Sequence, residues 1–380
     1  MKLAILKERR DGEARVAATP ETVKKLKGLG LDVVVESGAG ALARITDADY
    51  QAVGASIAPD MASALKDADI VFKVRGPSAD EIAQMKKGAV LAALLAPYSE
   101  KDTIARLAGA GISAFAMEFL PRISRAQAMD VLSSQANLAG YKAVIDAAAQ
   151  FGRAMPMMMT AAGTIAPARV LVMGVGVAGL QAIATAKRLG AIVSATDVRP
   201  ATKEQVESLG GTFVAVMDEE FKNAQTAAGY AKPMSPEYQA KQAALIAETI
   251  KKQDIVITTA LIPGRPAPRL ISKEMVASMR PGSVIVDLAV ERGGNVEGVK
   301  TDAVTETGGV KVVGNGNVPG RLAATASSLY AKNLLAFLDV LIDKKTKALV
   351  VNWDDDIVKA TALTRDGTIV HPNFKPKSAA

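Results

Sequence analysis

Short apolar runs alternate with helical patterns along the first third of the chain. Runs of this kind between turn residues predict buried strands, and a regular alternation of strands with helices predicts a parallel sheet. A helix is expected to begin after Thr19, because threonine is a favourable N-cap and Pro20 suits the first turn. The apolar runs are LAIL (3–6), DVVVE (32–36), DIVFKV (69–74), AVLAALL (89–95) and SAFAME (113–118).

A second series of apolar runs occupies the middle of the chain. Six runs separated by helical segments predict a doubly wound sheet. The runs are RVLVMG (169–174), AIVSATD (191–197), TFVAV (212–216), DIVITTA (254–260), SVIVDLA (283–289) and VKVVGN (310–315).

Two long helical patterns, over about residues 125–151 and 321–342, connect the two series. We therefore predict an α/β fold of two Rossmann-like doubly wound parallel-sheet domains, joined by long helices and with a cleft between them. The first domain is expected to comprise residues 1–132, completed by residues 320–380. The second domain is expected to comprise residues 133–319.

Composition narrows the possible functions. The 380 residues are 49% hydrophobic but only 4% aromatic, so the core is built from small aliphatic side chains, as in sheets buried on both faces. The net charge of +7 is not gathered into a stripe with stacking aromatics, which argues against a nucleic-acid partner. With no cysteine, disulfides and cysteine metal sites are excluded, and we expect no metal. No apolar stretch suits a signal peptide or a membrane helix, so we expect a cytoplasmic protein.

A glycine-rich turn stands at the start of the second series. Gly174, Gly176 and Gly179 form G-x-G-x-x-G after the strand RVLVM and before a helical pattern from Val177 to Leu189. The first glycine suits a tight turn, the second lets a pyrophosphate approach the backbone, and the third lets the helix pack closely on the strand. The helix N-terminus then faces the phosphates. The alternative is a glycine-rich turn without a ligand.

An acid stands at the end of the next predicted strand. Asp197 follows AIVSAT, 18 residues after Gly179, where a carboxylate accepts hydrogen bonds from the adenosine ribose. The same charge repels a 2′-phosphate, so the sequence favours NAD(H) over NADP(H). Arg199 complicates this interpretation, because a nearby arginine can accommodate that phosphate.

The connector from Met217 to about Pro236 is longer than the roughly two to six residues usual between a strand and a helix. Its AAGYAKPMSP segment has no apolar period and places Tyr230 beside Gly229. We interpret this connector as a lid that folds over the nucleotide. A tolerated surface insertion is the alternative.

Oxidation of an alcohol or amine by NAD needs a base, and the chain offers few. Its one histidine, His371, lies in TIVHP, which predicts a terminal strand far from the glycine-rich turn. Lys73, Asp130 and Glu291 each stand at or just after an apolar run. They are the alternative bases, although each suits a surface charge or an ion pair equally well.

Hydride transfer from one nicotinamide to another avoids the need for a base. Such a site requires polar groups that orient the carboxamide, in a geometry that lets two rings stack. Gln127 suits this role, because its amide cannot titrate but can hold another amide. The alternative is a polar segment that caps the long helix. The polar side chains of RISRAQAMDVLSS (122–134) are Arg122, Ser124, Gln127, Asp130 and Ser133.

Over nearly its whole length the chain resembles the family of alanine dehydrogenases and proton-translocating nicotinamide nucleotide transhydrogenases. Within this family, RISRAQAMD and the AGYAK loop are similar to the transhydrogenases. The matching stretches are KERRDGEARVAATPE, PRISRAQAMDVLSSQANLAGYKAVI, MMMTAAGT, VLVMGVGVAGLQAIATAKRLGAIVSATDVR, TTALIPGRPAP, PGSVIVDLAVERGGN and AKNLL.

The resemblance implies that NAD(H) binds in the cleft between the two domains. The catalytic residues it implies are those of a loop that positions the nicotinamide: Arg122, Gln127, Asp130 and Ser133. Tyr230 would belong to the family's mobile loop. The implied cofactor-binding residues are Gly174, Val175, Gly176, Val177, Ala178, Gly179, Asp197, Val198, Arg199, Gly229, Tyr230, Ala260 and Leu261.

The resemblance also implies an assembly. The chain is expected to form a homodimer and to work with a separate NADP(H)-binding component. Membrane subunits would couple hydride transfer to proton translocation. Because this chain stops at Ala380 without membrane helices, those subunits are expected to be separate polypeptides that hold it on the cytoplasmic face of the inner membrane.

The chain departs from the family's alanine dehydrogenases at one position that matters. Those enzymes carry a catalytic histidine at about Leu94 of this chain, and its absence argues against amino-acid oxidation. Their pyruvate-binding arginine and lysine have counterparts in Arg15 and Lys73, and their later catalytic aspartate corresponds to Glu291. The segment NGNVPGR (315–321) also departs from the family pattern. The rival functions are a stand-alone amino-acid dehydrogenase and an NAD(H) sensor without chemistry.

Overall fold

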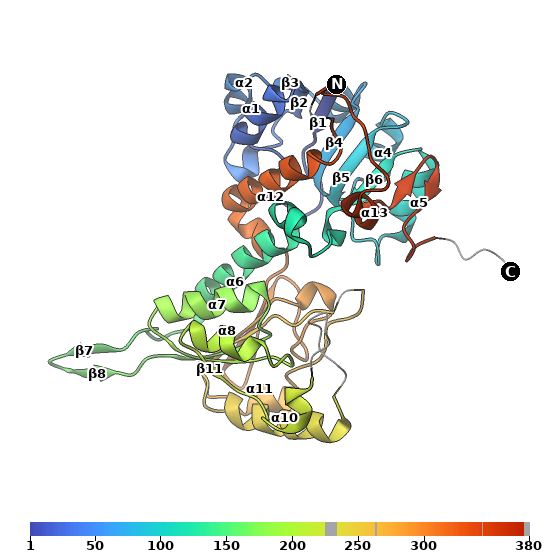
Figure 1. Ribbon diagram of the computed structural model, residues 1–380. Coiled ribbons are helices and arrows are strands. Elements are labelled where there is room, and N and C mark those ends of the chain that lie inside the picture. Colours follow the sequence, from blue (N-terminus) through green and yellow to red (C-terminus); the bar gives the residue numbers. More distant parts are fainter. Residues whose placement is uncertain (225–233, 263, 344, 376–380) are drawn as a thin grey trace. The chain divides into compact units, whose positions relative to one another are not determined.

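Two sheets, each flanked by helices, account for most of the chain (Figure 1). The computed structural model describes residues 1–224, 234–262, 264–343 and 345–375. One unit comprises Met1–Gln135 and Gly320–Ala380, and the other comprises Ala136–Pro319. The predicted α/β fold with two Rossmann-like sheets is confirmed.

The sheet of the first unit has the strand order β3-β2-β1-β4-β5-β6, with all neighbouring strands parallel. The order reverses between β1 and β4, the kind of switch point at which doubly wound sheets bind ligands. The strands are β1 (Lys2–Ile5), β2 (Asp32–Glu36), β3 (Ser56–Ala58), β4 (Ile70–Arg75), β5 (Val90–Leu94) and β6 (Ser113–Ala116). The helices are α1 (Pro20–Gly28), α2 (Asp47–Ala52), α3 (Met61–Leu65), α4 (Ala79–Gln84), α5 (Lys101–Gly109), α12 (Ala323–Leu338) and α13 (Asp356–Thr361).

Alternate residues of these strands enter two apolar layers. Leu3 and Ile5 of β1 pack in a layer with α1, α12 and α13, while Ala4 between them packs in a layer with α3, α4 and α5. Successive strand side chains point to opposite faces of a sheet. Both faces are covered, which explains why the strands read as continuous apolar runs.

The C-terminal segment completes the first unit. Trp353 stacks on Phe115 with ring centroids 5.9 Å apart, and the guanidinium of Arg365 lies 4.3 Å from the centre of the Trp353 ring. Asp366 and Gly367 both have positive φ, at 49° and 80°. Such a pair suits the two-residue turn that joins β16 (Thr364–Arg365) to β17 (Thr368–Ile369).

The second unit repeats this architecture in the order β11-β10-β9-β12-β13-β15-β14, with its switch point between β9 and β12. Its apolar layers lie on both faces, one with α6, α7 and α8 and one with α10 and α11. The strands are β9 (Arg169–Met173), β10 (Ile192–Thr196), β11 (Thr212–Phe213), β12 (Ile255–Thr258), β13 (Val284–Asp287), β14 (Ala303–Thr307) and β15 (Val310–Gly314). The helices are α6 (Val131–Gln150), which begins in the first unit, α7 (Val177–Arg188), α8 (Thr202–Ser208), α9 (Glu219–Lys222), α10 (Pro236–Ile250) and α11 (Lys273–Ala277).

The helix predicted from about residue 125 was placed too early. Residues 124–129 form a 3₁₀ helix, η3 (Ser124–Met129), and the α-helix begins at Val131. The carboxylate of Asp130 accepts the backbone N–H of Ser133 at 2.9 Å and its hydroxyl at 2.5 Å. This N-cap satisfies donors of the first turn and fixes the start of α6.

Other predicted boundaries also need correction. TFVAV forms a strand only at Thr212–Phe213, and the predicted terminal strand TIVHP ends at Ile369, before His371. β14 was not predicted, and it pairs antiparallel with β15 at the edge of an otherwise parallel sheet. A hairpin of β7 (Met158–Thr160) and β8 (Gly163–Ile165) was not predicted either. The hairpin extends away from the rest of its unit (Figure 1).

Candidate functional site

The turn between β9 and α7 consists of Gly174, Val175 and Gly176. Gly174 has a φ of +102°, and a Cβ there would lie 2.5 Å from Oγ1 of Thr259. A Cβ on Gly179 would lie 1.9 Å from the carbonyl oxygen of Gly174. A Cβ on Gly176 would meet no atom within 4 Å. The fold therefore requires two of the glycines, whereas the third leaves open space beside the backbone.

The N-terminus of α7 faces this open space without a side-chain cap. Its N-cap is Gly176, and no side chain accepts a hydrogen bond from the first turn. The first N–H groups of a helix have no partner within it, and they lie at the positive end of the helix dipole. Val177 is 39% exposed at this point. The turn and helix together form an anion site that fits a pyrophosphate.

Asp197 is anchored to the same turn. Its Oδ2 accepts the backbone N–H of Val175 at 2.7 Å, and its two oxygens accept Nε and Nη2 of Arg199, each at 2.9 Å. This hydrogen bond to Asp197 raises the pKa of Arg199. Val198 stands half-exposed between the two charged residues. A ribose hydroxyl at Asp197 must therefore share the carboxylate with Arg199.

The loop after β12 lies against the glycine-rich turn from the other side of the switch point. The hydroxyl of Thr259 donates to the carbonyl oxygen of Gly174 at 3.0 Å. Ala260 and Leu261 follow, and Leu261 is 53% exposed. The structure thus brings Ala260, Asp197 and the glycines together within the second unit.

The predicted nicotinamide-positioning residues belong to the first unit. Arg122 and Gln127 are exposed, while Ala126 and Met129 of the same segment are buried in the core with α12. Asn333 of α12 donates its Nδ2 to the carbonyl oxygen of Ala128 at 2.9 Å. The loop is therefore anchored by its apolar positions and presents its polar ones to solvent.

Asp130 and Ser133 make the helix cap described above, which is the alternative weighed from the sequence. Arg125 of the same loop pairs with Asp355 through two contacts, at 2.7 and 3.1 Å. These contacts give the loop a defined conformation. They leave Gln127 as the exposed amide of the segment.

The candidate bases have structural partners. The ammonium of Lys73 is buried, 2.9 Å from Oε1 of Glu81 and 3.5 Å from Oε2 of Glu8. Glu291 accepts the backbone N–H of Asn317 at 3.2 Å. Within the described ranges, no three histidine, aspartate or glutamate side chains gather as metal ligands would.

His371 is a packing residue of the first unit. Its ring stacks on Phe119 with centroids 4.8 Å apart, and its Nδ1 accepts the backbone N–H of Asn373 at 3.3 Å. Burial lowers the pKa of His371. The end of β5, where the resemblance places the catalytic histidine of alanine dehydrogenases, carries the aliphatic side chains of Leu94 and Leu95.

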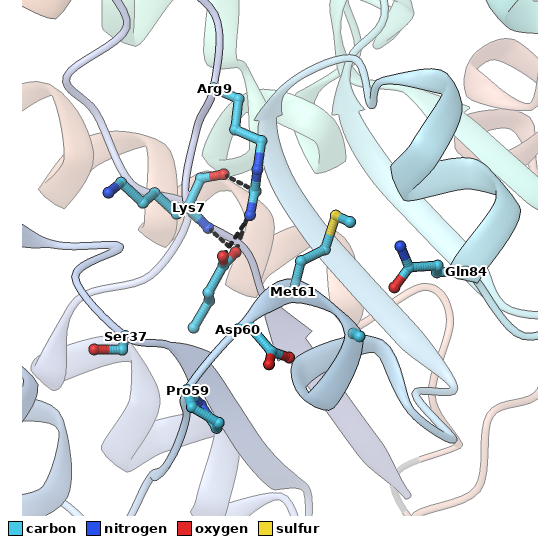
Figure 2. A pocket seen from close by; sticks show the side chains of 9 residues that line it. Lys7, Arg9, Ser37, Pro59, Asp60, Met61 and Gln84 are labelled. Atoms are coloured by element: carbon cyan, nitrogen blue, oxygen red, sulfur yellow. Dashed lines mark hydrogen bonds and ion pairs between the residues drawn. The ribbon is translucent and has the colours of Figure 1, made fainter.

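The first sheet has an acidic residue that corresponds to Asp197, but it has no glycine-rich turn that could bind a phosphate. Glu36 at the end of β2 accepts the backbone N–H of Lys7 at 2.9 Å and pairs with Arg9, much as Asp197 does in the second unit. A cavity of about 500 Å³ lies beside this pair (Figure 2). However, no glycine-rich turn follows β1, and the next helix begins only at Pro20. Of the two sheets, the second is therefore the one whose turn fits a pyrophosphate.

Sequence reasoning missed one glycine of the site. A Cβ on Gly140 of α6 would lie 2.0 Å from the carbonyl oxygen of Ala178, so α6 packs directly on the first turn of α7. Nothing in the local pattern marks Gly140, because its neighbour is 38 residues away in the sequence. Gly229 and Tyr230 lie outside the described residues.

Two doubly wound sheets, one with a glycine-rich turn that opens an uncapped helix, define a two-domain protein of the Rossmann class. Within this class the chain belongs to the alanine dehydrogenase/PNT family. The model of the family's N-terminal domain matches residues 4–139, and that of its C-terminal domain matches residues 143–372.

Individual relatives agree with the resemblance to transhydrogenases. The chain is 60% identical to the first part of NAD(P) transhydrogenase subunit alpha of Rhodospirillum rubrum over 384 residues, which cover 100% of both chains. The crystal structure of transhydrogenase from Sinorhizobium meliloti matches with 59% identity and a TM-score of 0.89, covering 97% of this chain and 100% of that one. Alanine dehydrogenase of Halomonas elongata is 31% identical over 379 residues, 98% of this chain and 95% of the relative.

Proposed function

We propose that this chain is the NAD(H)-binding component of a proton-translocating NAD(P) transhydrogenase. The observation that carries the proposal is its 60% identity to a transhydrogenase alpha subunit over the whole of both chains, against 31% to an alanine dehydrogenase. The reaction is direct hydride transfer between NAD(H) on this chain and NADP(H) on a partner component.

The geometry of the second unit supports NAD(H) as the bound coenzyme. The open space at Gly176 and the uncapped N-terminus of α7 fit a pyrophosphate. The carboxylate of Asp197 suits an unphosphorylated ribose and repels a 2′-phosphate. Arg199 is engaged by Asp197 through two hydrogen bonds, which opposes its use as a 2′-phosphate ligand. Arg199 is therefore a weaker argument for NADP(H) than it was from the sequence alone.

Transfer between two nicotinamides requires no titrating catalyst. When bound, the nicotinamide gives or takes a hydride, which is a proton with an electron pair. The second ring takes or gives that same hydride, so no O–H or N–H proton is released and no base is needed. In this proposal Arg122 and Gln127 orient the ring, and the Asp130–Ser133 cap holds their loop.

We propose that a separate NADP(H)-binding component and membrane subunits complete the enzyme. Proton translocation is assigned to the membrane subunits, which hold this chain at the cytoplasmic face of the membrane. Among the described residues, no helix has the length and apolar character needed to cross a membrane.

A reconstituted assay tests the proposal. The purified chain is mixed with a purified NADP(H)-binding transhydrogenase component, and hydride transfer from NADPH to an NAD analogue is followed by absorbance. Transfer is expected only when both proteins are present. No transfer at saturating nucleotides would support the NAD(H) sensor instead. Formation of NADH from L-alanine and NAD by the chain alone would support the amino-acid dehydrogenase.

In the same assay, Gln127→Asn is expected to slow hydride transfer by about 100-fold, because a displacement of the ring by about 1 Å has an effect of this size. The shorter amide shifts the ring but leaves the phosphates in place, so the Kd for NADH should change much less. Gln51→Asn, on the exposed face of α2, is the matched control and should affect neither. Equal losses of transfer and NADH binding in Gln127→Asn would contradict the positioning role.

We propose further that the chain forms a homodimer through the β7–β8 hairpin. Every residue of its two strands is exposed, including Met158, Met159 and Ile165. A two-stranded hairpin of this size is at best marginally stable by itself in water, and large apolar side chains exposed on both of its faces mark an interface. A second copy of the chain is the simplest partner, since most soluble oligomers are symmetric homo-oligomers.

Met159→Glu is therefore expected to convert the dimer into a 39.5 kDa monomer, measured by sedimentation velocity. Met159 is 74% exposed, so the charge costs little in the monomer but must be desolvated at an interface. Leu42→Glu is the control, because Leu42 is 67% exposed and belongs to the first unit, whereas the hairpin belongs to the second. A Met159→Glu variant that still sediments as a dimer would exclude the hairpin as the contact.

A further inference from the structure

The buried side chain of Asn295 joins two loops at the carboxyl edge of the second sheet. Asn295 follows β13, whereas its partners follow β12. Its Nδ2 donates to the carbonyl oxygens of Ala260 and Pro268, at 2.9 and 2.8 Å. Its Oδ1 accepts the backbone N–H of Ala260 at 3.1 Å. One amide therefore satisfies both backbone groups of Ala260, as a neighbouring strand would.

The main chain on either side holds Asn295 in place. Gly294 has a φ of +77°, and a Cβ there would lie 2.8 Å from Oδ2 of Asp287, the last residue of β13. The same Oδ2 accepts the backbone N–H of Val296 at 2.9 Å. The carbonyl oxygen of Asn295 accepts the backbone N–H of Leu270 at 2.8 Å. The backbone of Ala260 is therefore held, through Asn295 and its neighbours, against the end of β13.

Ala260 lies where one half of a bound dinucleotide is expected. Asp197, at the end of β10, marks the adenosine side of β9. A dinucleotide that crosses the switch point then carries its other half over β12, on the far side of the glycine-rich turn. Ala260 and the exposed Leu261 are the first residues after β12 and its Thr258–Thr259 end.

We propose that Asn295 is a positioning residue for the nicotinamide half of NAD(H). It fixes the backbone of Ala260 and so presents Leu261 to that half of the coenzyme. This inference rests on the proposed function. Without the amide, the Ala260 backbone loses its partners and the loop must be ordered by the ligand, which lowers the affinity. The adenosine half lies on the other side of β9 and should be unaffected.

The test compares two ligands of the purified full chain, NADH and 5′-AMP, by calorimetric titration. Asn295→Ala and Asn295→Asp are expected to raise the Kd for NADH by about tenfold, a change that one lost hydrogen-bond partner can account for. Asp keeps the shape of Asn but loses both donors. The Kd for 5′-AMP is expected to stay within about twofold of the wild-type value, since the glycine-rich turn and Asp197 are untouched.

Ile250→Ala is the control for general destabilisation. Ile250 is fully buried at the end of α10, next to the amino end of β12 and thus at the opposite edge of the sheet. This variant should lower the unfolding temperature without changing either Kd. Equal losses of NADH and 5′-AMP binding in the Asn295 variants, or no loss of either, would overturn the inference. A wild-type chain that binds neither ligand would instead overturn the proposed function and this inference with it.

Discussion

Replacing Gly179 with alanine is expected to abolish NADH binding and to destabilise the second unit. The added methyl carbon would lie 1.9 Å from the carbonyl oxygen of Gly174, so α7 must move away from β9 or the turn must open. Overpacking of this kind costs about 1–3 kcal/mol. The displaced N–H groups of α7 no longer face the pyrophosphate, and we expect the affinity to fall by at least about 100-fold, or ~2.7 kcal/mol.

Gly176→Ala tests whether the coenzyme needs a glycine at a position where the fold does not. Since a Cβ at Gly176 meets nothing within 4 Å, this variant should unfold at close to the wild-type temperature. Its methyl group occupies the space proposed for the pyrophosphate, so NADH binding should still be lost. NADH fluorescence titration and calorimetric unfolding measure the two effects. Wild-type NADH affinity in Gly176→Ala would show that the pyrophosphate does not pass over this residue.

Lys73→Met is expected to destabilise the first unit by about 3–5 kcal/mol, the usual cost of removing one partner from a buried ion pair. The ammonium lies 2.9 Å from Glu81 and 3.5 Å from Glu8, and all three side chains are buried. Without it, two carboxylates lose their nearest cation in a region of low dielectric. Chemical denaturation followed by circular dichroism measures the loss.

The loss should depend on pH. Burial raises the pKa of Glu8, and Lys73 opposes that shift, so the pKa rises further in the variant. A carboxyl group with a raised pKa binds more protons in the folded state than in the unfolded one, so stability falls as pH rises through this range. Lys73→Met should therefore lose less stability at pH 5 than at pH 8. The exposed pair of Lys86 and Asp69 is the control, and Lys86→Met should change little at either pH.

The sequence predicted the parts of the fold that have strong local patterns. The buried strands appeared as apolar runs because both faces of each parallel sheet are covered, and the glycine-rich turn appeared because its three glycines are close in sequence. β14 escaped prediction because four of its five residues are polar or small, Ala303 and Thr305 to Thr307. The β7–β8 hairpin escaped because it is apolar although exposed, the reverse of the pattern by which surface elements are recognised.

The candidate site was predictable where one short motif carries it and not where distant segments meet. Asp197 stands at a motif spacing from the glycines and was found. Gly140 packs against Ala178, and Asn295 is hydrogen-bonded to Ala260. The two residues of each pair are far apart in the sequence, and only the folded chain brings them together. The start of α6 was misplaced because Ser124 and Asp130 are both plausible caps, and the hydrogen bonds of Ser133 decide between them.

The only tryptophan of the chain, Trp353, contacts both Phe115 and Arg365 in the first unit. The second unit, with its glycine-rich turn, contains no indole. Intrinsic emission excited at the red edge therefore monitors the unfolding of the first unit alone, whereas far-ultraviolet circular dichroism monitors that of both units. Thermal unfolding of the two units can thus be recorded in a single cuvette without labels. The two signals show whether the units unfold together or one after the other.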